Sequence, residues 1–230
     1  ERADGFDIDC LSVGPSAYAH SGLTRAAFRG ANYLDAENIE QRAAVIARAV
    51  EGRHLIYVYW PNLDRAGHEH GVDSDQWRAA AAHVDELIDT LRACLPGNGR
   101  LIVTADHGMQ TVTERLWMES DHRLMMDVDA VAGEPRARFL YTSHVDDVAA
   151  RWTTVLDERA QVLTREEAVS EGLFGEVHPD MMDRIGDLVV LPSEGVIVGS
   201  RSFDPLLSSL AGQHGGLTDV ERRIPALILG

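Results

Sequence analysis

The sequence of 230 residues contains no lysine, so arginine accounts for all 21 residues counted as lysine or arginine. Against 37 acidic residues they leave a formal net charge of −16, and the chain lacks the basic surface that binds nucleic-acid backbones. This composition argues against a nucleic-acid polymer as partner, but not against a small anion held beside a bound cation. The absence of lysine indicates a GC-rich coding sequence, as in many bacteria, more than a function.

Cysteine is scarce and long apolar runs are absent. Two thiols, Cys10 and Cys94, are too few for a disulfide framework. No apolar run approaches the roughly 20 residues needed to span a bilayer, and no signal peptide opens the sequence. The 45% hydrophobic and 25% charged content is ordinary for a globular protein with a substantial core. We therefore expect a cytoplasmic protein without a membrane partner.

Strand-like and helix-like segments alternate along the chain, which predicts an α/β fold. His54–Trp60 and Arg100–Ala105 are short apolar runs of the kind that form buried strands. Between them, Ser74–Leu95 has apolar residues at helical spacing and predicts a long amphipathic helix. We expect the two strands to pair in parallel through a right-handed crossover. They would belong to a mostly parallel central sheet flanked by helices.

The segment Thr104-Ala105-Asp106-His107-Gly108-Met109 extends from the end of the second predicted strand. In open α/β sheets the functional crevice lies outside the carboxyl ends of the strands, where Asp106 and His107 are expected. One carboxylate oxygen and one imidazole nitrogen suit zinc or a similar divalent metal. Taken alone, however, the motif is better explained as a turn with a capping aspartate and a surface histidine.

Two further segments provide the same kinds of side chain. Asp64 and His68 lie four residues apart after the first predicted strand, so a helical turn or compact loop would point both the same way. His214 lies in Gly212-Gln213-His214-Gly215-Gly216, where the backbone can approach a ligand closely. A solvated histidine is common, but three such glycine-framed clusters in one domain predict a metal site.

These motifs together resemble the type I phosphodiesterase/nucleotide pyrophosphatase family of the alkaline phosphatase superfamily. The matching motifs, in the family's order, are Asp64-x-x-Gly67-His68-x-x-Gly71, Thr104–Met109 and Gly212-x-His214-Gly215. The resemblance implies an alkaline-phosphatase-like fold and two divalent metal ions. Asp64, His68 and His214 would bind one ion. Asp106 and His107 would give two ligands to the other. We expect zinc, with manganese as the alternative, because these ligands suit either metal.

The resemblance also assigns the middle of the chain. Strand-like residues at Asp127–Val131, Arg136–Thr142 and Asp187–Leu191 surround a helix-like segment, Val145–Glu158. In the family such a segment is a small insertion that shapes the substrate entrance. We expect residues 1–230 to be part of a single alkaline-phosphatase-like catalytic domain, with a small α+β insertion or cap at about 120–190.

One expected part of the family's site is missing from the sequence. Family members carry, well upstream of the Asp-x-x-Gly-His motif, a strand ending in a ligand aspartate and then a nucleophilic Thr or Ser. The hydroxyl residues Ser16, Ser21 and Thr24 better match a later family segment. We therefore expect the chain to be the C-terminal part of a longer domain. An N-terminal segment of the same protein would supply the nucleophile, so no catalytic residue is assigned within the chain.

The function implied by the resemblance is metal-dependent hydrolysis of phosphodiester or nucleotide pyrophosphate bonds. The substrate would be a small phosphate ester or nucleotide, attacked by the nucleophile to give a covalent phospho-enzyme that water then hydrolyses. Two alternatives stay open. One is a related phosphomonoesterase, phosphonate or sulfate hydrolase, or phosphoglycerate mutase. The other is a non-catalytic metal-binding module or fragment.

Overall fold

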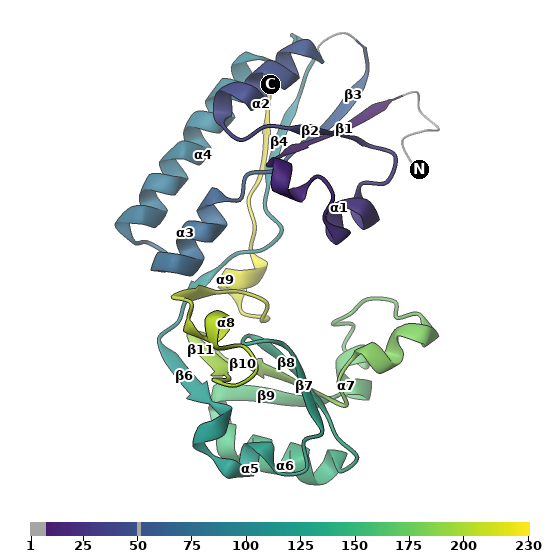
Figure 1. The fold of residues 1–230 in the computed structure, drawn as a ribbon, viewed down its shortest axis with the longest axis vertical. Coiled ribbons are helices and arrows are strands. Elements are labelled where there is room, and N and C mark those ends of the chain that lie inside the picture. The colour runs from purple at the N-terminus through teal and green to yellow at the C-terminus, as the bar shows by residue number, and fades with distance from the viewer. Residues whose placement is uncertain (1–7, 50–51) are drawn as a thin grey trace. The chain divides into compact units, whose positions relative to one another are not determined.

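The structure is a computed structural model that describes residues 8–49 and 52–230. Its contacts divide the chain into two units (Figure 1). The first unit comprises Glu1–Arg65, Asp75–Ala105 and Pro225–Gly230. The second comprises Ala66–Ser74 and Asp106–Ile224. Helix α3 (Asn62–His70) begins in the first set of residues and ends in the second.

A parallel three-stranded sheet forms the centre of the first unit. Its middle strand, β1 (Asp9–Gly14), pairs in parallel with β2 (Asn32–Asp35) and with β3 (His54–Val58). Side chains alternate between the two faces of a strand, so Ile56 and Val58 share one face of β3. That face packs against Ile46 of α2 (Ile39–Arg48) and against Leu87 and Leu91 of α4 (Asp75–Ala93). The predicted parallel strands and flanking helices are therefore confirmed for this sheet.

The strand before the Asp-His-Gly motif has a different partner from the one predicted. β4 (Leu101–Thr104) pairs antiparallel with β13 (Ala226–Leu229), with Thr104 opposite Ala226. Within residues 8–49 and 52–230, no hydrogen-bonded ladder joins β3 to β4, so the predicted direct parallel pair is wrong. The helix between them is present as α4, but a connecting helix does not determine which strand edge becomes the neighbour.

An antiparallel four-stranded sheet forms the centre of the second unit. The order of its strands is β7 (Ala130–Glu134), β8 (Ala137–Tyr141), β10 (Leu188–Pro192) and β9 (Ala160–Thr164). The predicted strand at Asp127–Val131 begins only at Ala130, because Asp127 has a left-handed backbone with φ of 56°. Helix α6 (Val145–Leu156) packs on this sheet through the fully buried Trp152, whose Nε1 donates to the Leu124 carbonyl at 2.9 Å.

Two short strand pairs complete the second unit. β11 (Val196–Gly199) pairs in parallel with β6 (Glu114–Trp117), and β12 (Gly212–Gln213) pairs antiparallel with β5 (Gln110–Thr111). Across the described residues, no helix is both long enough and apolar enough to cross a bilayer. The remaining helices of the two units are η2 (Ser16–Tyr18), α1 (Gly22–Ala27), η3 (Met118–Ser120), α5 (His122–Met125), η4 (Asp157–Arg159), α7 (Arg165–Ser170), η5 (Pro179–Arg184), α8 (Pro205–Ser209) and α9 (Asp219–Arg222).

Replacing Trp152 tests the core of the second unit. Trp152→Ala should lower the free energy of unfolding by about 3–5 kcal/mol, because it removes a fully buried indole and leaves a cavity. Trp152→Phe, which keeps an aromatic ring but loses the hydrogen bond to Leu124, should cost less. Urea denaturation followed by circular dichroism measures both variants. Equal losses in the two would contradict this account of the core.

Candidate metal centre

Helix α3 places the first two predicted ligands, Asp64 and His68, one turn apart. Residues i and i+4 of a helix share a face, so the sequence spacing alone directs both side chains the same way. Gly67 is buried in the same helix, and its carbonyl oxygen lies against Gly212 of β12. A methyl group built on Gly212 would overlap the carbonyl oxygen of Gly67. The absence of a side chain at Gly212 therefore lets β12 pack against the backbone of α3.

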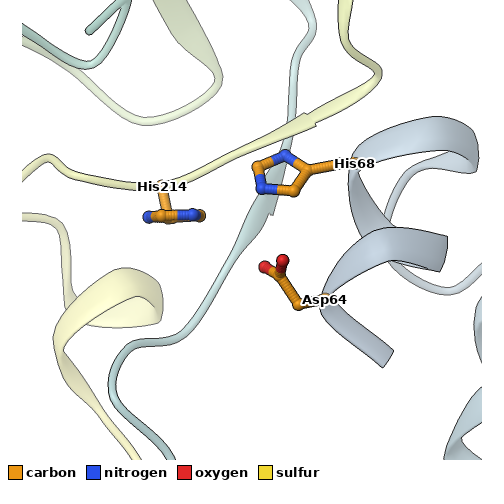
Figure 2. Close-up of side chains that lie close together, drawn as sticks. All are labelled: Asp64, His68 and His214. Atoms are coloured by element: carbon orange, nitrogen blue, oxygen red, sulfur yellow. The ribbon is translucent and has the colours of Figure 1, made fainter. Parts of the chain in front are cut away.

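The structure brings Asp64, His68 and His214 together, as Figure 2 shows. One ligand atom from each residue lies within 4.8 Å of the others, and all three residues are partly buried. The two imidazole rings have centroids 5.1 Å apart. A carboxylate with two imidazoles is a donor set that suits zinc and similar divalent ions. The three residues predicted to share one ion are thus close enough to do so.

The ring of His68 is oriented by the strand segment on which the helix packs. His68 Nδ1 lies 2.8 Å from the Gly212 carbonyl oxygen. A carbonyl only accepts, so Nδ1 carries the proton and the lone pair of the ring is on Nε2. The backbone strengthens the contact, because Ala211 N donates to the His68 carbonyl at 2.8 Å. A histidine with one nitrogen bonded to a carbonyl is the usual arrangement of a metal ligand.

The other predicted ligand pair lies beside this group but outside it. The ring of His107 stacks on that of His214, with centroids 3.4 Å apart and an interplanar angle of 16°. His107 Nδ1 donates to the Gly108 carbonyl at 2.9 Å, which leaves the lone pair on Nε2. The Asp106 side chain is 74% exposed, and its Oδ1 accepts from its neighbour's backbone, His107 N, at 3.2 Å. The structure therefore places His107 against the group and Asp106 at the surface.

The hydroxyl residues near the start of the chain have local structural contacts. Ser21 is the N-cap of α1, where its Oγ accepts from Thr24 N at 3.1 Å. The same hydroxyl donates to Thr24 Oγ1 at 3.0 Å. Ser16 N donates to the Glu37 carboxylate at 2.8 Å. These contacts belong to a helix start and a turn.

Sequence reasoning missed a buried ion pair in the second unit, between Arg136 and Glu221. Their side chains are 0% and 1% exposed, and Nη2 of the arginine lies 2.6 Å from Oε2 of the glutamate. Burial raises the pKa of Glu221, but hydrogen bonds from Arg136 and Thr218 outweigh it and lower the pKa to about 2. The one signal in the sequence was Thr218-x-x-Glu221, which forms a capping box at the start of α9.

Known proteins share the sequence pattern of this chain. The family described as type I phosphodiesterase/nucleotide pyrophosphatase matches residues 12–217. Over 70 residues the chain is 34% identical to ectonucleotide pyrophosphatase/phosphodiesterase family member 7 of Homo sapiens. That stretch makes up 28% of this chain and 15% of the human protein.

Solved structures share the fold. Murine ectonucleotide pyrophosphatase/phosphodiesterase 5 has a TM-score of 0.69 at 18% identity, over 94% of this chain and 59% of that chain. An inactive variant of the murine protein in complex with AMP has the same score and coverage at 19% identity. Phosphonoacetate hydrolase from Sinorhizobium meliloti 1021, solved with phosphonoacetate, has a TM-score of 0.65 at 17% identity, over 99% of this chain and 66% of that chain. This structural likeness confirms the predicted α/β, alkaline-phosphatase-like architecture. The chain spans only 59% of the length of the murine relative.

The low pKa of Glu221 makes part of the stability dependent on pH. A carboxyl whose folded pKa is about 2, below its ordinary value of 4.5, stabilises the fold fully above about pH 4.5. That contribution is lost as the pH falls from 4.5 toward 2. Glu221→Gln should therefore cost roughly 3–5 kcal/mol at pH 7, because it leaves Arg136 without a counter-charge, and progressively less in acid.

Urea denaturation of both proteins at pH 7, 4.5 and 3 measures this difference in the free energy of unfolding. The exposed Glu176→Gln is the matched control and should change stability by less than about 0.5 kcal/mol at each pH. A difference between Glu221→Gln and the unsubstituted protein that stays constant down to pH 3 would contradict the assignment.

Proposed function

We propose that this chain, which belongs to the type I phosphodiesterase/nucleotide pyrophosphatase family, carries part of the metal centre of a phosphoester hydrolase. The bonds hydrolysed would be phosphodiester or nucleotide pyrophosphate bonds. The observation that carries the proposal is the approach of Asp64, His68 and His214 to within 4.8 Å. Because the chain spans 59% of the murine relative, the activity of the whole protein is part of the proposal.

The donor group fits a divalent ion by its chemistry. Asp64 offers an anionic oxygen that offsets part of the ion's charge, while His68 and His214 offer neutral nitrogens. The bond from His68 Nδ1 to the Gly212 carbonyl fixes the tautomer and the ring orientation before any ion arrives. When bound, the ion would supply charge neutralisation at a phosphate and activation of a hydroxyl or water. Zinc is the ion we propose, with manganese as the alternative.

We assign a second ion to Asp106 and His107. Support comes from the stacking of the His107 ring on His214, which places an imidazole beside the first group. A Thr or Ser of an N-terminal segment outside residues 1–230 would supply the nucleophile, and a further carboxylate there would complete the second donor set.

The substrate in this proposal is a small phosphorus-containing anion. AMP and phosphonoacetate, the ligands of two structures with this fold, are both of that kind. We further propose that residues 1–230 are part of one catalytic domain, in which about 120–190 form a small insertion that shapes the substrate entrance. A phosphodiester or pyrophosphate substrate is favoured over a phosphonate because the family match names that chemistry.

Replacing His214 tests the metal assignment. His214→Ala should lose about one equivalent of zinc, because it removes one of three donors. In the form of the protein that carries the nucleophile, the same substitution should abolish hydrolysis of bis-p-nitrophenyl phosphate. Zinc content is measured by inductively coupled plasma mass spectrometry and hydrolysis by release of p-nitrophenol.

His178→Ala is the matched control, since His178 is a 71% exposed histidine of the second unit and should keep both zinc and activity. Full zinc content and full activity in His214→Ala would disprove the site. Faster hydrolysis of the monoester p-nitrophenyl phosphate than of the diester would point to the phosphomonoesterase alternative. Zinc binding without hydrolysis of either compound, even with the N-terminal segment present, would favour the non-catalytic module.

A further inference from the structure

The carboxylate of Glu221 bonds to the loop that carries His214. Its Oε1 accepts from Gly216 N at 3.0 Å, and its Oε2 accepts from the Thr218 hydroxyl at 2.6 Å. Gly216 lies two residues after His214, so the buried carboxylate fixes this loop just beyond the histidine. The bond is shielded from water, because the Glu221 side chain is only 1% exposed.

The backbone of the same glutamate bonds to the loop that carries His107. The Glu221 carbonyl oxygen accepts from Gly108 N, the residue next to His107, at 2.7 Å. The rings of His107 and His214 stack with their centroids 3.4 Å apart. One residue therefore bonds to the backbone close to both of the stacked histidines.

Two glycines make this close approach achievable. A methyl group on Gly108 would overlap the Val220 carbonyl oxygen. One on Gly216 would lie 2.6 Å from Arg136 Nη2 and 2.9 Å from Glu221 Oε2. Gly108, which follows His107, and Gly216, two residues after His214, therefore make room for helix α9 and the ion pair.

Arg136 connects this glutamate to the sheet of the second unit. It lies between β7 and β8, and its Nε and Nη2 donate to the two Glu221 oxygens at 2.9 and 2.6 Å. Its Nη1 donates to the carbonyl oxygens of Ser193 and Val196, where β10 leads into β11. The guanidinium thus has four bonds that join the sheet to the glutamate.

We propose that Glu221, held by Arg136, is a positioning residue that keeps His107 and His214 in place for metal binding. It acts through the backbones of the two loops and contacts neither ion nor substrate. The inference rests on the proposed function, since it presupposes that both histidines are metal ligands. Burying an ion pair costs desolvation energy, and apolar side chains of similar volume often stabilise a fold equally well. Apolar side chains could not accept the hydrogen bond that the Glu221 carboxylate accepts from Gly216 N of the His214 loop, so the ion pair has a role beyond packing.

A second ion pair in the same unit provides a matched control. Arg165 Nη2 donates to Asp187 Oδ1 at 2.7 Å, and Thr142 N donates to Asp187 Oδ2 at 2.9 Å. This carboxylate therefore binds the same kinds of partner as Glu221, an arginine and a backbone amide. Its partners lie next to β8 and β9, away from the two histidine loops in the sequence.

The test compares the zinc affinity of Glu221→Gln with that of Asp187→Asn by competition with a chromophoric chelator. Glu221→Gln should raise the Kd for zinc by about 10–100-fold, as loss of support for metal ligands typically does, and Asp187→Asn should not. The visible spectrum of bound cobalt should change in Glu221→Gln alone, since it reports ligand geometry. Wild-type affinity and spectrum in Glu221→Gln would overturn this inference and leave the proposed function intact. Failure of the unsubstituted protein to bind zinc or cobalt would overturn both.

A double variant separates positioning from folding, because Glu221→Gln leaves a buried guanidinium without its counter-charge. Arg136→Met with Glu221→Met removes both charges at similar volume and should keep a cooperative thermal transition. Unlike glutamine, methionine has no oxygen to accept from Gly216 N, so the zinc Kd should again rise by about 10–100-fold. A folded double variant with wild-type zinc affinity and cobalt spectrum would overturn the inference.

Discussion

The candidate metal centre depends on the contact between α3 and the strand segment at β12, which are separated by 144 residues in the sequence. His68 bonds to that segment twice, through its ring to Gly212 and through its carbonyl to Ala211. The contact is close because Gly212 carries no side chain, whose Cβ would overlap the Gly67 carbonyl oxygen. It orients one imidazole and also sets the position of the next, since His214 directly follows β12.

The ligand candidates could be predicted from the sequence because their signal is local. Asp64 and His68 have helical spacing, and His214 lies among glycines. The stacking of His107 on His214 could not be predicted, since it depends on how two loops meet. The buried ion pair that supports those loops could not be predicted either. Glu221 belongs to a capping box, which is common at exposed helix starts, and its arginine partner lies 85 residues earlier without a local trace of burial.

The fold shows the same division between local and distant information. Periodicity predicted α4 and the strands on either side of it, because the pattern of apolar residues depends only on sequence neighbours. Periodicity could not identify the partner of β4, since an apolar strand can pair with either a parallel or an antiparallel neighbour. The partner is β13, at the far end of the sequence. In the second unit the sequence predicted three strands around α6, which correspond to β7, β8 and β10. It did not predict the fourth strand, β9, because Ala160–Thr164 alternates too weakly to stand out.

The long separation in sequence between α3 and β12 also determines the order in which the parts of the candidate metal centre are synthesised. At roughly 5–20 residues per second, synthesis reaches Gly212 roughly 7–30 s after His68. During that interval the nascent helix carries Asp64 and His68 without the carbonyl that orients the ring and without the third donor. A chain still on the ribosome at that stage cannot assemble the donor group. The three candidate ligands can therefore come together only after His214 has been synthesised.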